Sequence, residues 1–172
     1  KEVYTNIYIM HEVYLGIGGN IGKKKFNFLK AYILIKKKLG KVLQTSSVYE
    51  TPPWGFNSPD NFWNMVVKIE TDLSPDELIS GIMSIEDSFY RLRTEGIYTS
   101  RKMDIDILYY DNVVMDSIKL TIPHPRLQDR LFVLVPLCEI APEHKHPLLK
   151  MTTLEMLENC NDRSAIKKII AL

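Results

Sequence analysis

Two acidic residues two positions apart stand in the segment Met103–Leu108, where they could hold a metal ion. The segment alternates like a strand, and a strand points residues i and i+2 to the same side, so Asp104 and Asp106 would be presented together. Mg²⁺ prefers oxygen ligands from one or two carboxylates, completed by substrate phosphates and water. Two carboxylates about 7 Å apart along a strand could share two metal ions. An exposed face of a half-buried strand shows the same alternation, so that interpretation stays open.

Three arginines, Arg91, Arg93 and Arg101, come shortly before this acidic pair, in or beside a polar segment that leads into the strand. Guanidinium groups beside a carboxylate pair can hold a metal-chelated triphosphate and neutralise charge as the bridging bond breaks. A solvated surface of ion pairs is the alternative, because such surfaces are frequent and contribute little stability.

Other candidate residues carry weaker signals. Glu86 lies beside the apolar stripe of a predicted helix, where an unpaired carboxylate would be costly, so we expect it to have a partner. His124, between two prolines, could donate to a phosphate or be structural. His144 and His146 stand in a polar stretch and are expected at the surface. Residues 16–23 match neither a P-loop nor a GxGxxG fingerprint, and predict a tight strand-to-helix turn.

The elements that must position these residues follow one another in the order β, α, β, β, α, β. The pattern predicts strands over residues 13–17, 42–49, 62–70 and 103–109, a short strand near 118–122, helices over 23–39 and after Ser74, a mixed segment over 127–141 and a C-terminal tail. This order is typical of the α+β class with a ferredoxin-like antiparallel sheet and packed helices, in three αβα layers.

The two predicted helices have recognisable faces and ends. The first places Phe26, Leu29 and Ile33 on one face, and Gly40 is a plausible cap at its C-terminus. The second begins with the capping sequence 74–77, which has serine at the cap, proline next and glutamate at the third helical position. Its buried stripe is predicted to comprise Leu78, Ile82, Ile85, Phe89 and Leu92. Residues 50–61 form a turn-rich stretch that we interpret as a functional loop.

Charge and composition narrow the class of protein. The 172 residues contain 22 basic and 21 acidic side chains, so the broad positive field of a nucleic-acid binder is missing. The sequence has no apolar run of the roughly 18 residues that a membrane span requires and no signal peptide. Cys138 and Cys160 stand in no metal-binding spacing, which suits a reducing cytoplasm. We expect a monomeric cytoplasmic protein with one domain over residues 10–172, after an N-terminal extension over residues 1–9.

Taken together and in order, these segments resemble the 6-hydroxymethyl-7,8-dihydropterin pyrophosphokinase family, from Val13 to about Pro147. The resembling stretches are residues 15–20, 47–55, Asn64, 85–86, 91–93, 101–108, 123–125, 130–137 and 139–142. The resemblance implies a Mg²⁺-dependent transferase that moves the terminal diphosphate of ATP to the hydroxymethyl group of the reduced pterin. The products would be the pterin diphosphate and AMP, in folate biosynthesis.

The resemblance also implies roles for individual residues. Asp104 and Asp106 would bind two Mg²⁺ ions that bridge the phosphates of the co-substrate ATP. The nucleotide and its phosphates would be surrounded by Glu86, Arg91, Arg101, Lys119, Thr121, His124 and Arg130, while Arg93 would assist closure. The pterin would be stacked between Phe62 and Phe132, with Asn64 and the backbone of Thr51, Pro52 and Trp54 reading its polar edge. The loops over 52–62 and 93–101 would act as lids that exclude water.

The sequence departs from the family pattern at a few positions. Gly19 replaces a usual serine, Tyr98 a common tryptophan, and Thr99-Ser100 a usual Gly-Pro, while Lys119 stands where some members have arginine. We expect altered lid behaviour with the chemistry retained. Two rival functions remain: a different metal-dependent nucleotidyl or phosphoryl transferase, and a non-enzymatic ferredoxin-like binding module in which the acidic pair is incidental.

Overall fold

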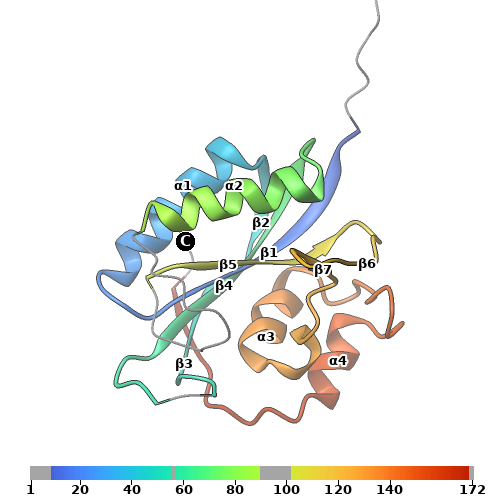
Figure 1. Cartoon of the computed structure of the whole chain (residues 1–172). Helices are drawn as coiled ribbons and strands as arrows, with labels where there is room; N and C mark the ends of the chain where they lie inside the picture. The colour runs from blue at the N-terminus through green and yellow to red at the C-terminus, as the bar shows by residue number, and fades with distance from the viewer. Residues whose placement is uncertain (1–8, 56, 90–101, 171–172) are drawn as a thin grey trace, which may run out of the picture.

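The fold is built on one antiparallel sheet, shown in Figure 1 by a computed structural model that describes residues 9–55, 57–89 and 102–170. The strands are β1 (His11–Gly19), β2 (Lys41–Thr45), β3 (Val48–Thr51), β4 (Phe62–Thr71), β5 (Asp104–Tyr110), β6 (Met115–Asp116), β7 (Thr121–Ile122) and β8 (Lys167–Ile170). The helices are α1 (Lys24–Lys38), α2 (Pro75–Asp87), α3 (Leu131–Ile140) and α4 (Thr153–Asn159), with a 3₁₀ turn at Leu127–Asp129.

The main sheet confirms the predicted topology. Its order is β5-β1-β4-β3-β8, and β2 pairs with β4 beside β3. Helices α1 and α2 cover one face and α3 and α4 the other, which gives the three αβα layers (Figure 1). Ferredoxin-like proteins have the same βαββαβ order with the first strand in the centre. None of the described helices is long and apolar enough to span a membrane.

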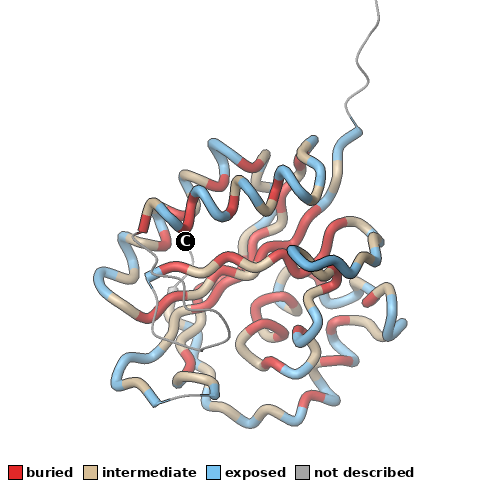
Figure 2. The backbone as a smooth tube through the Cα atoms, viewed as in Figure 1, coloured by how far each residue is buried: buried red, intermediate tan, exposed pale blue. Residues whose placement is uncertain are grey.

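Both faces of the central strands are buried, as the red tube through the middle of Figure 2 shows. On β1, Val13, Leu15 and Ile17 face the layer of α1 and α2, whereas Tyr14 packs in the opposite core under α3 and α4. Alternate residues of a strand point to opposite faces, so one strand contributes to two cores. The two candidate aspartates stand at the start of β5, where one face of the sheet is only half-buried.

Helix α1 turns a different face to the core from the one the sequence suggested. Phe26, Leu29 and Ile33 do share a face, but Phe26 is 64% exposed and the other two are also exposed. The buried residues are Phe28, Ala31 and Ile35. The helix has apolar stripes on two opposite sides, so periodicity alone does not decide which one packs. Gly40 follows the helix as predicted, with a φ of 149° and the backbone of Glu70 close against it.

The predicted strand over residues 42–49 is two strands. Ser46 and Ser47 interrupt it, and both are buried. The Ser46 hydroxyl accepts a hydrogen bond from the Val66 amide at 2.9 Å, and the Ser47 amide donates to Glu139 at 2.8 Å. Side-chain hydrogen bonds of this kind compete with the regular ladder and bend the chain between β2 and β3.

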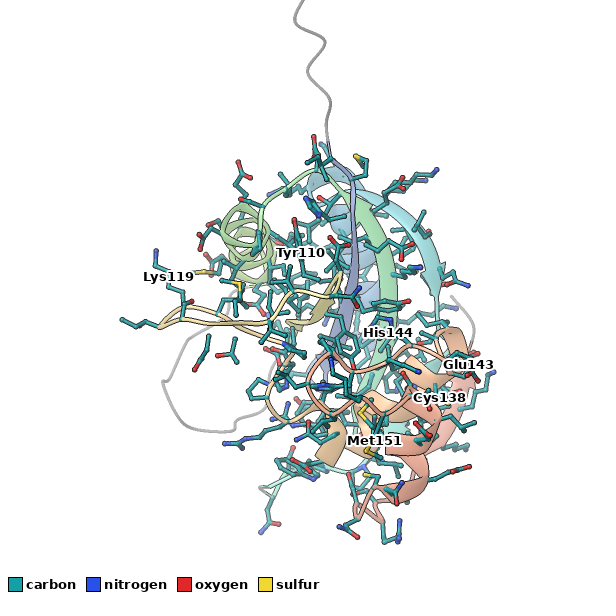
Figure 3. The ribbon with its side chains drawn as sticks, turned by 90° about the vertical axis from the view of Figure 1, so that its right-hand side faces the viewer. Tyr110, Lys119, Cys138, Glu143, His144 and Met151 are labelled. Carbon is teal, nitrogen blue, oxygen red and sulfur yellow. The ribbon has the colours of Figure 1, made fainter. Side chains whose placement is uncertain are left out.

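Helix α2 confirms its predicted capping box, since Ser74 and Glu77 bond reciprocally. Its stripe of Leu78, Ile82, Ile85 and Phe89 is buried, and Leu92 lies outside the described residues. The short strand predicted near 118–122 is shorter than expected, because only Thr121–Ile122 (β7) form a strand there. Residues 117–120 form the exposed tip of the β6–β7 hairpin, from which Lys119 projects in Figure 3.

The C-terminal part is more ordered than the expected tail. It contains α4, capped by Thr152 and Glu155, and β8, which pairs with β3. His146 is buried and His144 half-buried, so the prediction that both lie at the surface was wrong. The His146 Nδ1 accepts from the amides of Leu148 and Leu149, and the ring of His144 lies 4.4 Å from that of Tyr109. A tight turn and aromatic packing bury these imidazoles.

Candidate active site

The acidic pair of β5 lies beside two glycines of β1. Asp104 pairs with Gly18 and Asp106 with Gly16 across the antiparallel ladder. Because i and i+2 residues share a face, both carboxylates and both glycines face the same side of the sheet. The predicted presentation of Asp104 and Asp106 together is what the structure shows, with Asp106 43% exposed.

Gly16 and Gly18 are site residues that the sequence analysis assigned to a turn. They lie within β1, which continues to Gly19, so the predicted turn over 16–23 starts later than expected. A Cβ added at Gly18 would stand 3.1 Å from the Asn64 Oδ1, and one at Gly16 would stand 3.3 Å from Leu108. Glycine at alternate strand positions often marks a close approach of a ligand, and that spacing was the available signal.

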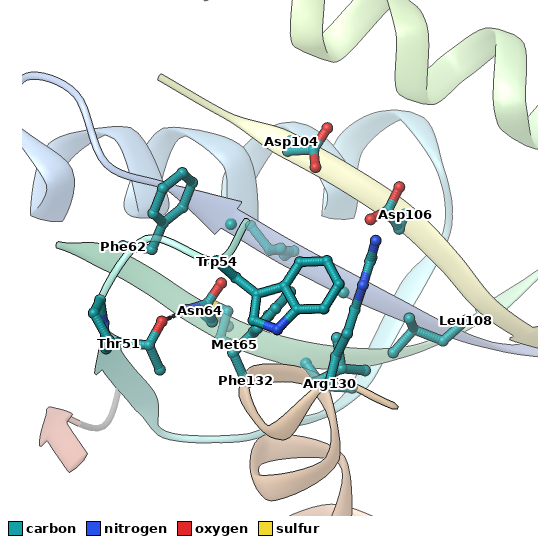
Figure 4. A pocket seen from close by; sticks show the side chains of 16 residues that line it. Thr51, Trp54, Phe62, Asn64, Met65, Asp104, Asp106, Leu108, Arg130 and Phe132 are labelled. Atoms are coloured by element: carbon teal, nitrogen blue, oxygen red, sulfur yellow. Dashed lines mark hydrogen bonds between the residues drawn. The ribbon is translucent and has the colours of Figure 1, made fainter. Parts of the chain in front are cut away.

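One pocket brings together most of the candidate substrate and metal residues (Figure 4). It is lined by Gly16, Ile17, Gly18, Thr51, Pro52, Trp54, Phe62, Asn64, Met65, Val66, Asp104, Asp106, Leu108, Arg130, Phe132 and Val133. The carboxylates stand on one wall, and the aromatic and amide side chains stand on the others (Figure 4). The pocket can therefore accept a molecule with a flat apolar body and an anionic or metal-bound end.

Aromatic rings and one guanidinium form the wall near α3. The ring centroids of Trp54 and Phe132 are 6.4 Å apart, and the ring planes are inclined at 62° to each other. The Arg130 guanidinium carbon lies 5.3 Å from the Trp54 ring and 5.6 Å from the Phe132 ring, although Arg130 is only 7% exposed. The expectation for Trp54 concerned its backbone, whereas the structure also places its indole in the pocket.

A buried amide stands between β3 and β4 on the pocket floor. The Asn64 Nδ2 donates to the Thr51 hydroxyl at 2.9 Å, drawn as a dashed line in Figure 4. This bond fixes the orientation of the amide. Asn20 reaches the loop that follows β3, because its Nδ2 donates to Ser58 Oγ and to the carbonyl of Asp60, each at 3.3 Å. Asn20 thus connects the loop over 52–61 to the end of β1, while Asn64 joins β4 to the end of β3.

His124 borders the acidic pair without lining the pocket. Its Nε2 lies 4.0 Å from the Asp106 Oδ2, and its Nδ1 accepts from the Arg126 amide at 3.2 Å. Burial and the Arg130 guanidinium lower the pKa of His124 to about 4, although Asp104 acts in the opposite direction. The ring is therefore neutral at pH 7. Its Nδ1 accepts from the backbone, and its Nε2 stands between the Arg130 Nη1, at 3.4 Å, and the Asp106 carboxylate.

Besides His124, three described residues that were expected around the nucleotide lie outside the pocket lining. Glu86 is buried at the end of α2, and its Oε1 accepts from the Ile105 amide at 2.9 Å, between the two aspartates in sequence. This bond supplies the partner that the sequence analysis expected. Lys119 and Thr121 belong to the β6–β7 hairpin, where Thr121 donates to Asp116 at 2.7 Å. Arg91, Arg93, Arg101, Tyr98, Thr99 and Ser100 lie outside the described residues.

The donor set of this site suits a divalent cation that also binds substrate oxygens. In the described part of the chain no group of three or more His, Cys, Asp and Glu residues could enclose a metal by itself. Two carboxylates on one strand face leave the remaining coordination positions to phosphate and water, which is the arrangement that Mg²⁺ prefers. Asp104 and Asp106 therefore fit Mg²⁺ better than they fit a structural zinc ion, which takes four protein ligands.

Comparison with known proteins identifies similar sequences. A 2-amino-4-hydroxy-6-hydroxymethyldihydropteridine pyrophosphokinase of Aquifex aeolicus is 38% identical over 141 residues, which make up 82% of this chain and 87% of that protein. The folic acid synthesis protein of Dictyostelium discoideum is 38% identical over 159 residues, or 91% of this chain. The chain spans only 24% of the length of that longer relative.

Solved structures share the fold. The wild-type HPPK-DHPS protein of Plasmodium falciparum superimposes with a TM-score of 0.71 at 16% identity, covering 90% of this chain and 45% of that one. The family model of 7,8-dihydro-6-hydroxymethylpterin-pyrophosphokinase (HPPK) matches residues 14–142, which include every residue of the pocket lining. The chain therefore belongs to the HPPK family.

Proposed function

We propose that this chain transfers the terminal diphosphate of ATP, in one step, to the hydroxymethyl oxygen of 6-hydroxymethyl-7,8-dihydropterin, releasing AMP. The observation that carries the proposal is the pocket itself, in which an acidic pair suited to Mg²⁺ stands opposite an aromatic and amide surface suited to a pterin. A kinase for a sugar or a protein has no evident use for the second surface. Membership of the family supports the same reaction.

The acidic pair would hold the reacting end of both substrates. Asp104 and Asp106 would bind two Mg²⁺ ions through their oxygens, and these ions, when bound, neutralise phosphate charge and make the hydroxymethyl oxygen a better nucleophile. The bond that forms joins that oxygen to the β-phosphorus, and the bond that breaks joins the β-phosphorus to the oxygen of AMP. The hydroxymethyl proton passes to solvent, since no side chain of the pocket is placed as an evident general base.

Neighbouring residues would position the phosphates. The His124 Nε2 borders the same space as Asp106, and the neutral ring in its Nε2–H tautomer would donate to a phosphate oxygen without adding charge. Arg130 would extend the positive surface from the other wall. We propose that Arg91, Arg93 and Arg101 supply further positive charge. Lys119 and Thr121 would lie around the nucleotide together with Glu86. The Glu86 carboxylate would act through its bond to the Ile105 amide of β5, on the side of the strand opposite the pocket.

The pterin would lie against the aromatic surface. Phe62 and Phe132 would stack on the ring, as offset aromatic pairs do. The Asn64 amide, oriented by Thr51, and the backbone of Pro52 and Trp54 would bond its polar edge. We further propose that the loop over 52–61 closes over the site and that the chain acts in the cytoplasm as a monomer. Closure would exclude water, the competing nucleophile.

The nucleotide product tests the proposal. The purified chain is mixed with ATP, Mg²⁺ and 6-hydroxymethyl-7,8-dihydropterin, and the nucleotides are separated by chromatography. We expect AMP that appears only when the pterin is present and that disappears with EDTA. ADP would instead indicate transfer of the γ-phosphoryl group alone, and the absence of any nucleotide product would contradict an enzymatic role.

A further inference from the structure

The start of α3 forms the wall of the pocket that carries Arg130 and Phe132. The first amides of a helix lack partners within the helix and are usually capped by the preceding side chain. Arg130 is the residue at that position and provides no such cap. The Leu131 amide instead donates to the Oδ2 of Asp162 at 3.1 Å, so the cap comes from a residue 31 positions later in the chain.

Asp162 is itself held in a fixed orientation. Its Oδ1 accepts from the Ser164 hydroxyl at 2.5 Å and from the Ser164 amide at 2.9 Å. Partial burial would raise the pKa of Asp162, but the hydrogen bonds from Ser164 and Leu131 outweigh it and lower that pKa below its usual value. The side chain is therefore a carboxylate at neutral pH, and its negative charge complements the positive end of the α3 dipole.

A second contact from the same part of the chain joins β8 to α3, and the same α3 residue bonds the start of β3. The Lys168 Nζ of β8 lies 3.1 Å from the Oε1 of Glu139, two turns beyond Phe132 on α3. The Glu139 carboxylate also accepts from the Ser47 amide and hydroxyl, each at 2.8 Å, and from the Tyr49 hydroxyl at 3.0 Å. Strand β3 then ends at Thr51, which orients the Asn64 amide.

From these contacts we infer that the C-terminal segment of residues 160–170 positions the pterin-binding side of the pocket. Within this segment, Asp162 is the positioning residue for the start of α3. The segment lies beyond the family match at residues 14–142. The inference rests on the proposed function, because the pterin is the ligand whose binding it concerns. Asp162 does not line the pocket. It acts through the backbone that carries Arg130 and Phe132.

The alternative is that Asp162 is only a stabilising helix cap, and a matched variant separates the two. Thr152→Ala removes the side-chain cap of α4. Neither Thr152 nor Glu155, the two residues of that cap, lines the pocket. We expect Asp162→Ala to raise the KM for the pterin about tenfold, equivalent to about 1.4 kcal/mol of binding, while kcat and the KM for ATP stay within about twofold. Thr152→Ala should lower the melting temperature about as much as Asp162→Ala does, but it should leave the pterin KM unchanged.

Asp162→Asn provides a second variant with less risk to folding. It keeps an oxygen acceptor for the Leu131 amide but loses the charge, so its pterin KM should lie between those of the wild type and of Asp162→Ala. A wild-type pterin KM in both Asp162 variants, or an equal rise in Thr152→Ala, overturns the positioning role. Wild-type protein that forms no pterin-dependent AMP would overturn the proposed function instead, so the two failures are distinguishable.

Discussion

At the residue scale, the two carboxylates of the site lie next to glycine positions of the neighbouring strand, which have no side chain. Asp104 and Asp106 face the same side as Gly18 and Gly16, their partners in β1. The missing side chains leave space between the carboxylates and the Asn64 amide on the next strand. A substrate can therefore approach the sheet at the point where metal-bound phosphate and the pterin would meet in the proposed reaction.

Removal of either carboxylate should abolish most turnover without unfolding the protein. Asp104→Ala and Asp106→Ala each remove an oxygen ligand, and we expect kcat to fall by about a hundredfold or more, because charge stabilisation in the transition state is lost. Steady-state AMP formation and thermal melting measure the two effects. Asp72→Ala, an exposed aspartate after β4, is the control that should retain full activity. Near-wild-type turnover in either β5 variant would refute the metal-site assignment.

A methyl group on the pocket floor should obstruct the pterin. In Gly18→Ala the new Cβ would stand 3.1 Å from the Asn64 Oδ1, so the amide must shift by a few tenths of an ångström or lose its orientation. We expect the pterin KM to rise by about tenfold, because small misplacements of binding groups are costly, with little change in melting temperature. Titration of the tryptophan fluorescence of Trp54 and Trp63 with the pterin checks the binding step. Unchanged affinity would show that the pterin does not approach this floor.

At the scale of elements, α2 and β5 are joined by a buried carboxylate. Glu86 is 3% exposed and binds the Ile105 amide, which stands between the two aspartates. The helix thereby supports the strand from the side opposite the pocket. α3 is connected in the same manner to β3 through Glu139 and Ser47. Both connections fix the strands that carry site residues, and neither is local in sequence.

Loss of the Glu86 side chain should affect stability more than nucleotide binding. Glu86→Ala leaves the Ile105 amide buried without its acceptor, which should lower the free energy of unfolding by about 1–3 kcal/mol. Urea denaturation measures this change. Asp87→Ala, at the exposed neighbouring position, should be close to neutral. A raised KM for ATP with unchanged stability would favour direct nucleotide contact by Glu86 over this supporting role.

At the scale of the whole molecule, three buried or half-buried histidines link stability to pH. Burial lowers the pKa of His144 and His146, and burial with Arg130 lowers that of His124 to about 4. Unfolded histidines titrate near pH 6.5, so below that pH the unfolded chain binds more protons than the folded one. The stabilisation from neutral imidazoles is fully present above pH 6.5 and is lost as the pH falls towards the folded pKa values.

Replacement of one histidine should reduce this acid sensitivity. The His144 Nε2 is buried and has no hydrogen-bond partner among the described residues, while its ring packs against Tyr14 and Tyr109. His144→Phe keeps the aromatic packing and should remove at most about 1 kcal/mol of the stability loss between pH 7 and 5.5. Melting temperatures across that range measure the effect, with exposed Lys145→Ala as the control. An unchanged pH profile would contradict the assignment.

The linear order of residues determined the fold class and the chemistry of β5. The strand period of two places Asp104 and Asp106 on one face whatever surrounds them, and the capping box at Ser74 is satisfied within four residues. These are local properties, so the sequence contains them in full. The resemblance to the family added the aromatic and amide residues of the pocket.

Only the tertiary structure decided which surfaces meet. The choice between two apolar stripes on α1 depends on contacts with α2 and the sheet, and both stripes have helical spacing. The glycines of β1 became pocket residues because β4 and β5 pair on either side of them, a register set by antiparallel packing across some 50 to 90 positions. Asp162 caps α3 through a contact that no periodicity indicates. Non-local contacts arise from packing the whole chain at once, so local sequence patterns do not specify them.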